Sequence, residues 1–140
     1  NEAIAAARAD GMPIIAIGNE LRPSDLVMNL LRRNSAVAGS AGAQWDARVP
    51  IDGVAYFAKQ RGDAFSNPAL AVHLQEKGVD EVVLSGLMAR ACVTATTKGA
   101  LARGLKVAIL RDAVADLSNR ARDLALARLT RRGADVRTRP

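Results

Sequence analysis

A single cysteine is the strongest candidate for chemistry in this sequence. Cys92 follows the apolar run Glu81 to Leu84 across the turn Ser85 to Ala91, where the next helix is expected to begin. Amides at the N-terminus of a helix, together with the helix dipole, favour the charged thiolate, which is the nucleophilic form of cysteine. The same amides could stabilise a developing oxyanion. The alternative is a small buried cysteine that packs a helix, and position alone leaves both interpretations open.

A lysine and an aspartate stand at comparable positions. Lys59 comes directly after the apolar run Val54 to Phe57, so its ammonium group could stabilise a neighbouring thiolate or bind a polar substrate group. The alternative for Lys59 is a solvated side chain at the end of a strand. Asp112 follows the run Lys106 to Leu110, where it could bind substrate, cap a helix or form a loop salt bridge.

The remaining candidates are aromatic residues and the single histidine. Trp45, Tyr56 and Phe65 could line an apolar pocket or pack an ordinary core. His73 lies within an expected helix and far from any strand end. That position argues against a papain-type pair of cysteine and histidine.

The elements that must position these residues alternate between helix and strand. Short apolar runs rich in Val, Ile and Ala lack polar alternation, which is typical of parallel strands covered on both faces. We therefore predict an α/β fold of three αβα layers around a mostly parallel central sheet, where ligands bind beyond the carboxyl ends of the strands. The predicted strands are Pro13 to Ile17, Val54 to Phe57, Glu81 to Leu84, Lys106 to Leu110 and Ala134 to Val136.

Capping residues mark the predicted helices. Asn67 followed by Pro68 predicts the start of one helix, and Gly78 its end. Two further helices are expected to start near Cys92 and Ser118, with the end of each marked by a glycine, Gly104 and Gly133.

The segment from Asn19 to Pro50 has weaker signals. Asp25 to Arg33 predicts a short helix, whereas Ser35 to Gln44 has no periodicity and is expected to be a long connection.

Composition bounds the function. The 140 residues, 49% hydrophobic and 24% charged, predict one globular domain over residues 1–140 without a linker. One cysteine and one histidine exclude a disulfide framework and a closed zinc site, and no run is long enough to span a bilayer. No signal peptide is recognisable, which favours the cytoplasm. The net charge of +6 raises the possibility of nucleic-acid binding, but the basic residues are spread out and lack stacking aromatics.

Several segments resemble the isochorismatase-like cysteine hydrolases. The run Val82 to Val93 is similar to the nucleophile turn of that family, with a strand, a glycine, a five-residue gap and a Cys-Val pair. Lys59 to Phe65, followed by Leu70, resembles the catalytic-lysine motif. The opening Ala7 to Ile17 and the later stretch Ala100 to Val107, followed by Asp112, resemble further strands and helices of the family.

The resemblance implies a Cys-Asp-Lys triad that cleaves C–N bonds of small amides or ureido compounds through a thioester. Cys92 would be the nucleophile and Lys59 its cationic partner, with the amides of Met88 and Cys92 as the oxyanion hole and a cis peptide between Leu87 and Met88. Phe65 and Trp45 are candidate substrate-binding residues. No cofactor or metal is implied, and the expected partners are a small-molecule substrate and further copies of the chain, as a dimer or tetramer, without nucleic acid or membrane.

Two departures from the family pattern shape these expectations. The triad aspartate of the family ends its first strand, which is missing here, and neither Asp10 nor Asp25 stands at that position. We therefore expect the aspartate upstream of Asn1, in an N-terminally truncated chain. The zinc-binding Asp-His-His pattern of nicotinamidases is also missing, which implies a metal-free member. The presence of Cys92 disfavours the true isochorismatases, because those enzymes lack the nucleophile. The alternative function is that of a non-catalytic small-molecule binding protein that kept the fold.

Overall fold

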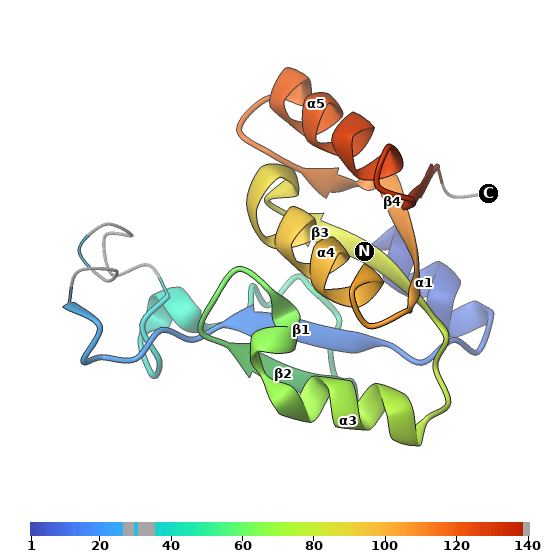
Figure 1. The fold of residues 1–140 in the computed structure, drawn as a ribbon. Helices are drawn as coiled ribbons and strands as arrows, with labels where there is room; N and C mark the ends of the chain where they lie inside the picture. The colour runs from blue at the N-terminus through green and yellow to red at the C-terminus, as the bar shows by residue number, and fades with distance from the viewer. Residues whose placement is uncertain (27–29, 31–35, 139–140) are drawn as a thin grey trace. The chain divides into compact units, whose positions relative to one another are not determined.

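The chain folds as two compact units, Asn1–Arg61 and Gly62–Pro140. A computed structural model describes residues 1–26, 30 and 36–138 of the sequence (Figure 1). Within these residues, no helix combines the length and the apolar character that crossing a bilayer requires.

The first unit contains a two-stranded parallel sheet. Its strands pair in register, with Ile15 opposite Ala55 and Asn19 opposite Lys59, so both strands end at the same level. The side chains of Asn19 and Lys59 therefore emerge at one edge, as expected for the carboxyl ends of parallel strands. The elements of this unit are α1 (Glu2–Ala9), β1 (Ile15–Asn19), the 3₁₀ turn η1 (Ala41–Ala43) and β2 (Ala55–Lys59).

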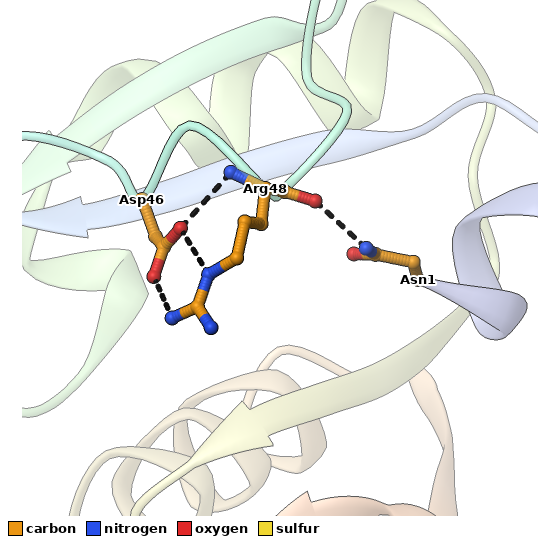
Figure 2. A network of polar contacts seen from close by, with 3 residues as sticks. All are labelled: Asn1, Asp46 and Arg48. Atoms are coloured by element: carbon orange, nitrogen blue, oxygen red, sulfur yellow. Dashed lines mark hydrogen bonds and ion pairs between the residues drawn. The ribbon is translucent and has the colours of Figure 1, made fainter.

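Polar contacts attach helix α1 to the connection that precedes β2. The Asn1 side-chain amide donates to the carbonyl oxygen of Arg48 at 2.7 Å (Figure 2). The backbone N–H and the guanidinium group of Arg48 both donate hydrogen bonds to the carboxylate of Asp46. Further along α1, Arg8 donates to the carbonyl oxygen of Pro50 at 3.0 Å. The hydrogen bonds from the Arg48 side chain and backbone hold the pKa of Asp46 below its usual value.

The second unit is built on a three-stranded parallel sheet in the order β3-β4-β5 (Figure 1). Its core includes Ile109 from the middle strand and Leu126 and Leu129 from the long helix, each at most 2% exposed. Its elements are η2 (Ala64–Ser66), α3 (Pro68–Glu76), β3 (Glu81–Leu87), the π-helical turn η3 (Ala89–Val93), α4 (Thr94–Leu101), β4 (Lys106–Ala115), α5 (Asn119–Thr130) and β5 (Asp135–Arg137).

The five predicted strands are confirmed, as are the predicted starts of two helices. Asn67 caps α3, because its side-chain oxygen accepts from the backbone N–H of Ala69 at 3.1 Å, and Gly78 follows the helix with a φ of 63°. Ser118 caps α5 in the same way, with its hydroxyl oxygen accepting from Ala121 N–H at 3.2 Å. These side chains satisfy backbone groups that a helix end leaves without partners.

The last third of β4 differs from the sequence-based expectation. The strand runs on to Ala115, with a register shift opposite Ser85, so Asp112 lies inside an irregular strand and not at its end. Polar residues ended the apolar run at Leu110, but the exposed side of the sheet tolerates them. The carboxylate that follows the strand is Asp116.

The helix predicted from Asp25 to Arg33 lies largely outside the described residues. Beyond it, the predicted long connection contains the turn η1 and a short bridge in which Leu21 N–H donates to the Ala36 carbonyl oxygen at 2.7 Å and Ala38 N–H to that of Leu21 at 2.9 Å.

Candidate active site

Cys92 lies in the π-helical turn η3, between the end of β3 and the start of α4. It is half-buried, and its thiol forms no disulfide. Helical structure begins at Ala89, so Cys92 belongs to the first turn of the helical segment and does not open it as predicted. Sequence periodicity does not report a π turn, in which an N–H bonds to a carbonyl oxygen five residues earlier, as Val93 does to Met88.

Local hydrogen bonds fix the turn around Cys92. The carbonyl oxygen of Met88 accepts from the N–H of Ala91 at 3.0 Å and from the N–H of Val93 at 3.2 Å. The hydroxyl of Thr94 donates back to the Ala89 carbonyl oxygen at 2.6 Å. The predicted cis peptide between Leu87 and Met88 is present just before the turn.

Asp116 connects this turn to the end of β4. Its carboxylate accepts from the N–H of Arg90 at 2.8 Å and from the N–H of Leu117 at 2.7 Å, and the Arg90 guanidinium lies 3.2 Å away. Burial alone would raise the pKa of Asp116, but the two backbone hydrogen bonds and the Arg90 charge outweigh it and hold the pKa below its usual value. Sequence reasoning missed Asp116, because the predicted strand ended at Leu110 and only the extension of β4 to Ala115 places this carboxylate directly after the strand.

Lys59 is buried at the end of β2, with only 5% of its surface exposed. Its ammonium nitrogen donates to the side-chain oxygen of Asn19 at 2.6 Å and to the carbonyl oxygen of Arg61 at 2.9 Å. The solvated alternative is therefore wrong for this lysine. A buried ammonium requires such oxygen acceptors, because its desolvation is costly without them.

Asn19 is the partner that sequence reasoning missed in the first unit. It ends β1 directly opposite Lys59, so the parallel register alone brings the two side chains together. An amide side chain two residues beyond the predicted strand was the signal for it. Lys59 and Cys92 belong to different compact units, and their functional pairing stays a prediction.

Trp45 and Tyr56 pack edge to face in the first unit, with ring centroids 6.4 Å apart. They line a pocket of about 320 Å³ together with Glu20, whose carboxylate accepts from the Tyr56 hydroxyl at 2.6 Å. Partial burial and the Glu20 carboxylate raise the pKa of Tyr56 to about 12. Trp45 thus lies beside a cavity, and its contact with a substrate stays a prediction.

Phe65 is a buried residue of the second unit. The Arg103 guanidinium carbon lies 4.6 Å from the centroid of its ring, and its N–H donates to the Asp63 carboxylate at 2.9 Å. Cation–π packing of this kind gives the ring a structural role, and a contact with substrate stays a prediction. His73 lies within α3, as expected.

No cluster of three or more His, Cys, Asp or Glu side chains that could hold a metal ion occurs in the described part of the chain. The described residues thus provide a thiol in a hydrogen-bonded turn of the second unit and, in the first unit, a buried ammonium group.

The sequence matches a known protein family. A family model described as the isochorismatase domain matches residues 1–140. The chain is 31% identical over 121 residues to N-carbamoylsarcosine amidase of an Arthrobacter species, a match covering 79% of the chain and 46% of that protein. It is also 31% identical over 94 residues to maleamate amidohydrolase of Pseudomonas putida, covering 67% and 44% of the two proteins.

Among solved structures, an isochorismatase-like hydrolase from Alkaliphilus metalliredigens matches with a TM-score of 0.84 and 28% identity, over 91% of this chain and 69% of the other. These matches confirm the predicted α/β fold class. The chain spans slightly less than half the length of the two relatives named above.

Proposed function

Because the chain belongs to the isochorismatase family, we propose that this protein is an amidohydrolase that cleaves a C–N bond of a small amide or ureido compound. The single observation that carries the proposal is Cys92, held in a fixed turn after β3 within a segment that resembles the nucleophile motif of the family. Two relatives support the reaction class, since one is an N-carbamoylsarcosine amidase and the other a maleamate amidohydrolase.

The proposed chemistry is covalent catalysis by Cys92. Its sulfur attacks the carbonyl carbon, the C–N bond breaks, and the proton lost from the thiol ends on the leaving nitrogen. Water then hydrolyses the thioester, releases the acid and restores the thiol. The backbone amides of Met88 and Cys92 are the proposed oxyanion donors, because the same hydrogen-bonded turn carries both and so limits their movement.

Lys59 is the proposed cationic partner. Its burial against two oxygen acceptors supports the role, because an immobilised ammonium group needs little reorganisation to stabilise a negative charge. Asn19 would then be a positioning residue for this ammonium.

The test is ammonia release from N-carbamoylsarcosine, maleamate and a panel of related small amides, measured on the full-length protein. Cys92→Ala should abolish turnover of any substrate found, and mass spectrometry should detect an acyl adduct on Cys92 in the unmodified protein. Lys59→Met should reduce kcat by at least about 100-fold, whereas the matched control Lys77→Met, at an exposed lysine after α3, should leave it unchanged.

Undiminished turnover by Cys92→Ala would refute the role of the thiol. A protein that binds amides of this panel without turning any of them over would instead be the non-catalytic alternative. The triad aspartate, the cytoplasmic location and the homo-oligomeric state stay predictions.

A further inference from the structure

The second unit contains a strongly basic pocket of about 560 Å³ between the segment Arg90 to Lys98 and helix α5. Five of its eight lining residues are cationic and none is acidic. Cys92 is not among the described residues that line it. The lining residues, which we call the arginine pocket, are Arg90, Thr94, Lys98, Ala125, Arg128, Leu129, Arg131 and Arg132.

Helical spacing explains why the cations converge. Arg128, Arg131 and Arg132 stand three and four residues apart in and just after the last turn of α5, which places them on one face. Arg90 and Lys98 come from the opposite wall, which is formed by η3 and α4. Helix α5 contacts both of these elements.

The charges in the arginine pocket are poorly balanced. Arg90 is paired with Asp116, but among the described residues no ion pair involves the other four cations, and the guanidinium of Arg131 donates only to the Ala127 carbonyl oxygen at 3.3 Å. The dipole of α5 favours positive charge at its C-terminal end. The dipole does not explain why cations from two walls surround one cavity, because like charges repel one another.

We propose that the arginine pocket binds a small molecule that carries several phosphate groups. Guanidinium groups match phosphate oxygens in paired hydrogen bonds, and a bound polyanion would remove the repulsion among the cations. The volume lies in the range of small-molecule pockets. Ala125 and Leu129 add an apolar patch for the carbon skeleton of such a ligand. The proposal does not depend on amide hydrolysis.

A nucleic-acid strand is the less suitable occupant. Surfaces that track single strands combine an extended basic groove with aromatic side chains on which bases stack. The arginine pocket is one cavity, and no aromatic side chain is among its described lining residues.

The experiment is isothermal titration calorimetry of the full-length protein with inorganic tripolyphosphate, at low and at physiological salt. We expect a one-to-one complex whose Kd rises at least about tenfold in the Arg128→Gln/Arg132→Gln variant. The matched control is Arg120→Gln, which removes the same kind of charge at the start of α5, outside the pocket, and should change the Kd less than about twofold.

Three outcomes would overturn the proposal. The first is a lack of tripolyphosphate binding in the millimolar range at low salt. The second is an equal loss of affinity in the pocket variant and the Arg120→Gln control, which would show binding to net charge alone. The third is a single-stranded oligonucleotide that binds much more tightly than tripolyphosphate and loses affinity in the same pocket variant, which would assign the surface to nucleic acid. Amide turnover by the pocket variant is a separate measurement, so failure of this proposal and of the hydrolase proposal can be told apart.

Discussion

Replacing Gly99 by alanine tests how the segment after Lys59 is attached to helix α4. A Cβ on Gly99 would lie 2.5 and 2.6 Å from the two carboxylate oxygens of Asp63, which is too close for any real contact. The same carboxylate caps the turn η2 by accepting from Phe65 N–H. Gly99→Ala must therefore displace Asp63 and disrupt this cap.

The expected magnitude follows from three opposing effects. Overpacking costs about 1–3 kcal/mol and a lost cap about 1 kcal/mol. The higher helix propensity of alanine returns about 1 kcal/mol. Gly99→Ala should therefore lower the free energy of unfolding by about 2 kcal/mol, despite being a change that favours helix formation.

A double-mutant cycle with Asp63→Ala isolates the cause. Asp63→Ala alone should cost about 1 kcal/mol through the lost cap, and it removes the obstructing carboxylate. In that background Gly99→Ala should become neutral or stabilising by up to about 1 kcal/mol. Urea unfolding of the four proteins, monitored by far-ultraviolet circular dichroism, measures all these differences. If Gly99→Ala destabilised both backgrounds equally, the Asp63 carboxylate would not be the obstacle to a Cβ at this position.

Two further substitutions probe polar groups of the second unit. Because the folded-state pKa of Asp116 is depressed, its stabilising effect is present above the unfolded-state pKa near 4 and is lost as the pH falls through the folded-state value. Asp116→Asn should thus lower the free energy of unfolding at pH 7 and do so progressively less below pH 4, whereas Asp80→Asn, at an exposed carboxylate, should change it little at either pH. Thr97 is fully buried, and its hydroxyl has no hydrogen-bond partner among the described residues, so Thr97→Val should raise the free energy of unfolding by about 1 kcal/mol. Thr94→Val, which removes the hydrogen bond to the Ala89 carbonyl oxygen, should lower the free energy of unfolding by a similar amount. If both threonine substitutions changed the free energy of unfolding in the same direction, the hydrogen bonding of the two hydroxyls would not explain their effects.

Local signals in the sequence were sufficient to predict the helices and strands of the fold. Asn67 and Ser118 act on backbone groups two or three residues away, so their capping roles can be predicted without knowledge of the tertiary structure. The five strands were found for a similar reason, since an uninterrupted apolar run needs no partner to be recognised. Their ends were predicted less well, because β4 continues through polar residues on an exposed face.

The contacts that organise the site could not be predicted in this way. Asn19 and Lys59 are 40 residues apart, and Arg90 and Asp116 are 26 residues apart. Each pair depends on the register of two strands or on the path of a turn, which a single sequence does not specify. The π turn η3 was not predicted, because such single turns are rare within helices and the sequence pattern does not distinguish them from α turns.

The π turn also determines which kind of genetic change would disturb the thiol most. Successive residues of an α-helix advance by about 100°, and a π turn accommodates one residue more than an α turn. Deleting one residue from Ala89–Val93 could therefore leave α4 as a regular helix while rotating the preceding residues by about 100° relative to it. Deletion of the codon for Ala89, Arg90 or Ala91 would reorient the nucleophile without removing it. For alignments of related genes, a gap of one codon here is thus more informative than most substitutions.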